Sequence, residues 1–224
     1  MKKKTRVIKT PEGTFTVAAG GRLSSSEELD ILHDHAVELY RAAQFNECLQ
    51  VMHQLHQVRH DNPEYLHTFG LALSGVGHHL LALSVLERTV ALAPGNVRFR
   101  LSLGFAQMRS GNPAQAEATF EGALSSFPDD PDLLSDLACC LVISGKSYQR
   151  AEQLLRRALG CQANEQFLLS NLGQVLWYQG RLAEAEREFN RGIEIDPTSH
   201  LADVIRHIQA TLARTPPPID PSLN

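Results

Sequence analysis

Residues 168–197 read LLSNLGQVLWYQGRLAEAEREFNRGIEIDP, and this stretch decides the fold class. Apolar side chains recur three and four residues apart on both sides of Gly180. That spacing is typical of amphipathic α-helices. Gly180 lets the backbone turn between the two helices, and the Asp196-Pro197 step ends the second. The stretch therefore predicts a hairpin of two helices.

The same hairpin recurs along the chain. Its turn glycines follow one another at steps of 34, 34 and 35 residues, at Gly77, Gly111, Gly145 and Gly180. Small residues repeat with the same period at Ala82, Ala116, Ala151 and Ala185. A fixed period of this length indicates a stack of like supersecondary units. We predict that residues 24–199 hold five units, at 29–62, 63–96, 97–130, 131–165 and 166–199.

The markers within a unit resemble the tetratricopeptide repeat (TPR) family. The fifth unit carries that family's pattern as Leu172-Gly173, Gly180, Ala185, Phe189 and Pro197. The third unit repeats it with Leu103-Gly104, Gly111, Ala116, Phe120 and Pro128. The resemblance implies an all-α fold, a right-handed α-α superhelical solenoid of tetratricopeptide repeats. The first unit is degenerate, with Ala43 among the residues that replace the signature, and the fourth has Ala138 in place of glycine.

The two ends differ from the repeats. Residues 1–23 form an N-terminal arm, interpreted as a β-hairpin around Pro11-Glu12-Gly13 or as a disordered segment. Residues 200–213 have one apolar stripe and are expected to form a helix that caps the last repeat. Residues 214–224 are a Pro-rich tail.

Composition excludes several functional classes. The 21 basic and 25 acidic residues give a formal net charge of -4, which does not provide the basic footprint of a nucleic-acid-binding protein. No apolar stretch approaches the roughly 20 residues of a membrane span. The four cysteines contain no C-x-x-C pair and are interpreted as free thiols of a reducing compartment, so a cytoplasmic location is expected.

Motifs for chemistry are missing from the sequence. It has no phosphate-binding glycine loop, no G-x-S-x-G and no H-E-x-x-H, so we predict that the chain is not an enzyme and needs no cofactor. His53, His56 and His60 lie on one helical face and are weak candidates for a metal site. A solvated helix face is the interpretation we favour for them.

The family resemblance implies a binding site for other proteins. In that family the first helices of successive units line a concave groove that binds a peptide segment of a partner. The matching groove positions here are His67, Leu71, Arg98, Leu101, Phe105, Met108, Arg109, Cys139, Asn171, Gln174, Trp177 and Tyr178.

These candidates are mostly apolar or neutral. Family members that clamp the C-terminal carboxylate of heat-shock chaperones use a set of Lys, Arg and Asn instead, so that ligand is disfavoured. Phe105, Met108 and Trp177 suggest apolar anchors for a partner, with Asn171 and Gln174 able to hydrogen-bond its backbone.

Three functions follow as hypotheses. The leading one is a non-catalytic scaffold or adaptor that binds other proteins through the groove. An alternative is a cytoplasmic chaperone for a secretion or pilus-assembly client. A third is the recognition subunit of a larger enzyme complex. The partner and the oligomeric state are left open.

Overall fold

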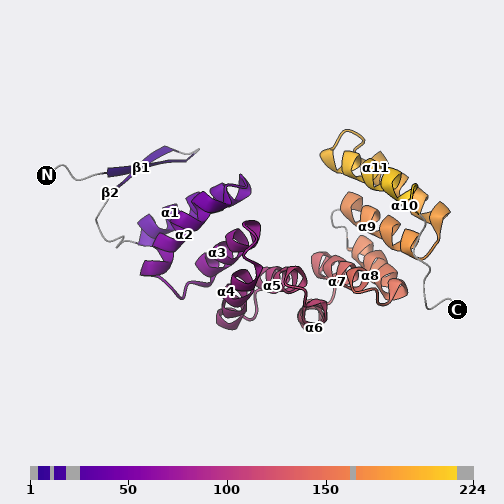
Figure 1. The fold of residues 1–224 in the computed structure, drawn as a ribbon, viewed down its shortest axis with the longest axis horizontal. Helices are drawn as coiled ribbons and strands as arrows, with labels where there is room; N and C mark the ends of the chain where they lie inside the picture. Colours follow the sequence, from indigo (N-terminus) through magenta and orange to yellow (C-terminus); the bar gives the residue numbers. More distant parts are fainter. Residues whose placement is uncertain (1–4, 11–12, 19–25, 162–164, 216–224) are drawn as a thin grey trace. The chain divides into compact units, whose positions relative to one another are not determined.

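The computed structural model describes residues 5–10, 13–18, 26–161 and 165–215 (Figure 1). The chain divides into two compact units, Met1–Ala106 and Gln107–Asn224. Each unit is described by itself below. The described residues of both units are overwhelmingly helical, which confirms the predicted all-α fold class.

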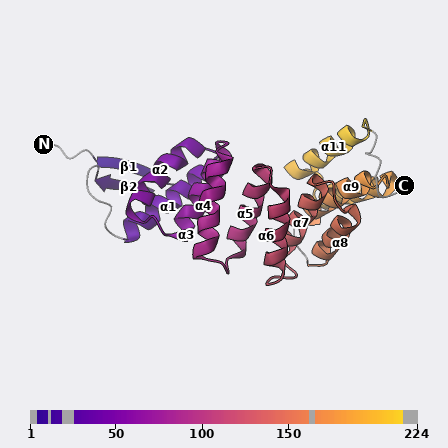
Figure 2. The ribbon, with the colours of Figure 1, turned by 60° about the horizontal axis from the view of Figure 1, so that its bottom comes forward.

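The first unit contains two strands and a series of helices. Its elements are β1 (Thr5–Thr10), β2 (Gly13–Ala18), α1 (Ser26–Arg41), α2 (Phe45–Val58), α3 (Pro63–Gly75), α4 (His79–Leu92) and most of α5 (Val97–Arg109). The strands pair antiparallel, with Thr5 opposite Ala18 and Thr10 opposite Gly13. The Pro11 and Glu12 of the expected turn lie outside the described residues. From α1 to α4 each helix packs against the next one in the chain (Figure 2).

The second unit continues the same pattern. Its elements are the end of α5, then α6 (Pro113–Leu124), α7 (Pro131–Ile143), α8 (Tyr148–Gly160), α9 (Glu165–Tyr178), α10 (Leu182–Ile195) and α11 (His200–Leu212). Each helix from α6 to α11 again packs against its neighbour in the chain. Each of the five predicted units holds two helices, and α11, which also contacts α9, follows the last of them.

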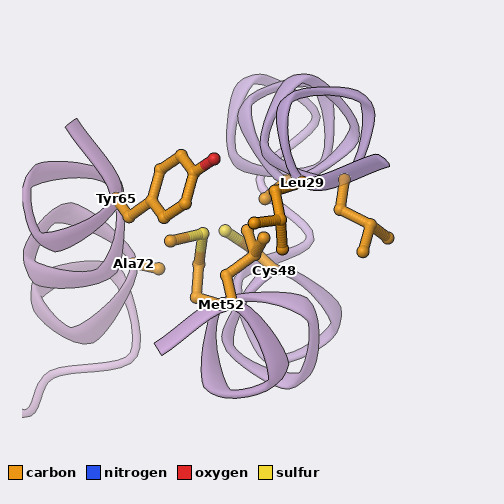
Figure 3. Packing of buried hydrophobic residues seen from close by; sticks show 8 residues of the cluster. Leu29, Cys48, Met52, Tyr65 and Ala72 are labelled. Atoms are coloured by element: carbon orange, nitrogen blue, oxygen red, sulfur yellow. The ribbon is translucent and has the colours of Figure 1, made fainter. Parts of the chain in front are cut away.

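Neighbouring hairpins share their hydrophobic core. In the first unit Leu29 of α1, Cys48 and Met52 of α2, and Tyr65 and Ala72 of α3 form one buried cluster (Figure 3). Figure 3 shows the side chains of the three helices pointing toward one another. Because the third helix belongs to the next hairpin, one hairpin buries its apolar face only when the next is stacked on it.

The two helices of a hairpin approach closely at small residues. Ala82, Ala116, Ala151 and Ala185 are at most 2% exposed. A Cβ atom added at Gly173 of α9 would lie 2.6 Å from Cε1 of Phe189 on α10. The same addition at Gly70 of α3 would lie 2.8 Å from Cγ of Leu86 on α4. Both glycines therefore make room for a large side chain of the paired helix.

The turn inside each hairpin requires a left-handed residue. Gly77, Gly111, Gly145 and Gly180 have φ angles of 87°, 79°, 63° and 74°. Ala43, which lies 34 residues before Gly77, has a φ of 56° and stands alone among the described non-glycine residues in having a positive φ. The left-handed conformation brings Cβ of an L-residue close to the following carbonyl oxygen and costs roughly 1–2 kcal/mol.

Replacing Ala43 with glycine should therefore stabilise the first unit. We expect a gain of about 0.5–1 kcal/mol, because the relief of strain exceeds the extra entropy that glycine gives the unfolded chain. Urea unfolding followed by circular dichroism measures it, and Gly77→Ala should shift the midpoint the opposite way. An unchanged midpoint for Ala43→Gly would contradict the strain argument.

Replacing Gly173 with alanine should destabilise the second unit by about 1–3 kcal/mol, although alanine is the better helix former. The cause is the contact that its Cβ would make with the buried ring of Phe189. Gly122→Ala in α6 is the matched control, because a Cβ there meets nothing within 4 Å. The control should be neutral or stabilised by up to about 1 kcal/mol. Equal stabilities of the two variants would rule out close packing as the reason for the glycine.

Candidate functional site

Polar side chains join the first helices of neighbouring hairpins at equivalent positions. Each bond links residues 35 or 36 positions apart, which is close to one repeat length. The bonds are His33 Nε2 to Thr68 Oγ1 at 2.9 Å, His67 Nε2 to Ser102 Oγ at 2.8 Å, and Asn171 Nδ2 donating to Ser135 Oγ at 3.2 Å. His67 and Asn171, two of the predicted groove residues, are thus engaged in stacking the repeats.

His67 is a neutral core histidine. It is 5% exposed, and burial, with smaller contributions from Arg98 and His33, lowers its pKa to about 4. The ring lies beside Phe99, with centroids 4.8 Å apart. Because its folded-state pKa lies below the ordinary value of 6.5, its contribution to stability is complete above pH 6.5 and is lost as the pH falls toward 4.

The other predicted residues of α3 and α5 are more accessible. Leu71, Leu101 and Met108 are half-buried, while Phe105 is 43% exposed. The side chain of Arg98 is 59% exposed, forms an ion pair with Glu64 and lies over the Phe99 ring. Arg109, at the end of α5, is exposed.

Four predicted residues of the second unit meet at one pocket. Cys139 of α7 and Asn171, Gln174 and Tyr178 of α9 line a pocket of about 170 Å³ that we call the α7–α9 pocket. The remaining walls are apolar and come from α7, α8 and α9, as Val142, Ile143, Leu155 and Val175. The predicted residue Trp177 is not part of it, because its side chain lines a second pocket formed with α10 and α11.

The α7–α9 pocket combines apolar walls with an edge of two stacked aromatic rings. Tyr178 stacks on Tyr148 of α8, with ring centroids 5.4 Å apart and an interplanar angle of 10°. Ile143, at the end of α7, is 67% exposed. The amide of Gln174 donates a long bond of 3.5 Å to the Ser170 carbonyl of its own helix. The pocket can therefore take up an apolar group and offer a side-chain amide beside it.

Asp136 lies on α7, as Cys139 does, and was not among the predicted site residues. It is half-buried on α7, three residues before Cys139. Burial raises its pKa to about 7, and the charges of Asp132 and Asp130 contribute in the same direction. The signal in the sequence was the four-residue spacing of Asp132 and Asp136, which places both on one helical face.

Three cysteine thiols, those of Cys48, Cys139 and Cys140, have raised pKa values. Burial, and then the neighbouring Asp136, raises the pKa of Cys139 to about 12. Burial also raises the pKa of Cys48 to about 11 and increases the pKa of Cys140. Since the thiolate is the nucleophile, these three thiols are poorly suited to covalent chemistry at neutral pH. All four cysteines are free.

The three weak metal candidates lie on α2 and just beyond it. His53 contacts Gln57, with 3.1 Å between His53 Nε2 and Gln57 Nε2, and His56 stacks on Phe69 with ring centroids 6.0 Å apart. His60 pairs with Asp61 at 3.1 Å. Within residues 5–10, 13–18, 26–161 and 165–215 no three His, Cys, Asp or Glu side chains are grouped to hold a metal ion. In the described part of the chain no helix has the length and apolarity needed to cross a bilayer.

Replacing Asp136 with asparagine should stabilise the protein in a pH-dependent manner. The folded-state pKa of Asp136 lies above the ordinary 3.8, so its contribution to stability is complete below pH 3.8 and is lost as the pH rises through 7. Asp136→Asn should raise the free energy of unfolding by roughly 2–4 kcal/mol at pH 8 and leave it nearly unchanged at pH 4.

Urea unfolding at both pH values measures this difference. Asp203→Asn, at an exposed carboxylate of α11, is the control and should change stability by no more than about 0.5 kcal/mol. An effect of Asp136→Asn that is the same at pH 4 and pH 8 would refute the assignment to its charge.

Comparison with known protein families returns one description. A family model described as Tetratricopeptide repeat matches residues 76–138, and another with the same description matches residues 166–199. A search of curated proteins found none that matches this sequence.

Solved structures share the fold. A thermophilic TPR protein of Thermus thermophilus, TTC0263, has a TM-score of 0.72 at 19% identity, over 84% of this chain and all of that one. MamA from Desulfovibrio magneticus RS-1, residue 41 to its end, has a TM-score of 0.64 at 15% identity, over 79% and 99% of the two chains. MamA of AMB-1 has a TM-score of 0.60 at 20% identity, over 75% and 99%. At these identities the likeness is one of fold.

Proposed function

Because the chain belongs to the tetratricopeptide repeat family, we propose that it is a non-catalytic scaffold that binds a peptide segment of a partner protein. The fold is typical of scaffolds for protein–protein interaction, and proteins built of these repeats are generally not catalysts. The thiols with raised pKa values support a role without covalent chemistry. The free cysteines also support a reducing, cytoplasmic location.

The α7–α9 pocket is the observation that carries this proposal. It is open, its walls are mainly apolar, and it gathers four of the groove residues that the family resemblance implies. In the proposed complex one apolar side chain of the partner enters between Val142, Ile143 and Tyr178. Burying such a side chain fully contributes roughly 1.5–3 kcal/mol. That is enough for an anchor, while the rest of the segment adds affinity along the same face.

Gln174 provides the polar part of the proposed site. Its amide lines the pocket, and its bond to the Ser170 carbonyl is long at 3.5 Å, so reorienting it toward a partner costs little. One amide carries both a donor and an acceptor, which suits the backbone of an extended segment. Asn171 is less available, since it already donates to Ser135. In the first unit, taken by itself, Phe105 on α5 is 43% exposed and is proposed as a separate contact for a partner.

Val142→Glu should abolish most of the binding at this pocket. A carboxylate placed on the apolar wall would have to be desolvated by the incoming side chain. To test it, a displayed random peptide library is selected on the wild-type chain, and the Kd of enriched peptides is measured for each variant. We expect at least about tenfold weaker binding for Val142→Glu, which corresponds to about 1.4 kcal/mol.

Val204→Glu is the matched control for this experiment. Val204 lies on α11 of the same unit, is 37% exposed and does not line the α7–α9 pocket. Its replacement makes the same chemical change and should leave the Kd unaltered. Circular dichroism verifies that both variants keep their helicity. Peptides that bind both variants as tightly as the wild type would refute the α7–α9 pocket as the binding site.

A further inference from the structure

The accessible side of α7 is a narrow stripe of four residues. Within residues 133–141 only Asp136 and Cys139 are not buried. Asp132 is exposed one turn before them, and Ile143, one turn after them, is 67% exposed. Their spacings of four, three and four positions place all four on one helical face, which we call the α7 stripe. A segment bound along the α7 stripe therefore meets two carboxylates at one end and the apolar α7–α9 pocket at the other.

The carboxylates of the α7 stripe are not balanced by basic side chains of the helices around them. α6, α7 and α9 contain no lysine or arginine. α8 also packs on α7, and its three arginines form ion pairs with other carboxylates, namely Arg150 with Glu121, Arg156 with Glu152 and Arg157 with Asp129. Asp130, just before the stripe, already accepts a bond from the N–H of Leu133. In the described part of the chain the Asp136 carboxylate makes no hydrogen bond or ion pair.

Asp136 lies where a cation from outside the chain would be stabilised. Its side chain is half-buried one turn before Cys139, which lines the α7–α9 pocket. Burial is the main cause of its raised pKa, and the negative charges of Asp132 and Asp130 add to it. An opposite charge nearby favours the ionised form of such a group. Carboxyls perturbed by burial and by like charges occur frequently at functional sites. The α7 stripe is therefore complementary in charge to a basic side chain.

We propose that the partner segment at the α7–α9 pocket carries a lysine or arginine close to its apolar anchor, and that this cation pairs with Asp136. The inference rests on the proposed function and specifies the chemistry of the segment. At a rise of 1.5 Å per residue, Asp136 and Ile143 lie about 10 Å apart along α7. An extended segment covers that length in about three residues. The basic residue is therefore expected two or three positions from the apolar anchor, and Asp132 adds attraction at the exposed end of the stripe.

A displayed random peptide library, selected on the wild-type chain at pH 8, tests this proposal. Pocket-dependent peptides are those whose binding is weakened by Val142→Gln, which makes the apolar wall polar without adding charge. We expect them to carry a lysine or arginine two or three positions from a large apolar residue. Replacing that basic residue with glutamine should raise the Kd at least about tenfold on the wild-type chain and less than about twofold on Asp136→Asn. Asp203→Asn, the same change at an exposed carboxylate of α11, should behave as the wild type.

Unfolding does not confuse this test, because Asp136→Asn is expected to stabilise the chain at pH 8, and circular dichroism verifies the helicity of each variant. Pocket-dependent peptides that lack a basic residue would overturn the charge inference and leave the proposed function standing. So would a basic residue whose replacement costs the same on the wild-type and Asp136→Asn chains. If no enriched peptide responds to Val142→Gln or Val142→Glu, or if none is enriched, the proposed function itself fails and this inference fails with it.

Discussion

The close crossing of two helices within each hairpin is the contact on which the structure depends. A small residue on one helix faces a large one on the other, as Gly173 faces Phe189 and Gly70 faces Leu86. The crossing requires a sharp turn between the helices, and this explains the left-handed glycines that recur with the period of the repeat. It also turns one apolar face of the pair outward, and only the next hairpin can bury that face.

The stacking of hairpins determines which side chains of the first helices remain accessible. At equivalent positions of the first helices, polar side chains are used in bonds between repeats, as in His67 with Ser102 and Asn171 with Ser135. Those residues hold the scaffold together. The positions that remain accessible in the second unit, around Gln174 and Tyr178, line the α7–α9 pocket. This separation follows from geometry, because a side chain that packs against the neighbouring repeat is not accessible at the surface.

Two consecutive aromatic residues of α9 lie on different surfaces of the second unit. Trp177 and Tyr178 are consecutive and their rings touch edge to face, with centroids 5.2 Å apart. Consecutive helical residues point about 100° apart. Tyr178 therefore lines the α7–α9 pocket while Trp177 lines the second pocket, formed with α10 and α11. The family resemblance placed both among the groove residues, since it carries over positions in the repeat and does not show how far α11 extends over α9.

The helical hairpins and their period could be predicted from the amino-acid sequence, and the same spacing puts Ala43 at the first turn, because each repeat needs the same turn and the same helix faces. The burial and ionisation of individual side chains depend instead on how the helices pack. His67 became a buried neutral histidine, and Asp136 became a half-buried carboxyl with a raised pKa. The difference arises because turns and helix faces follow from residues close together in the chain. Burial and electrostatic environment are set by helices that come together from distant parts of it.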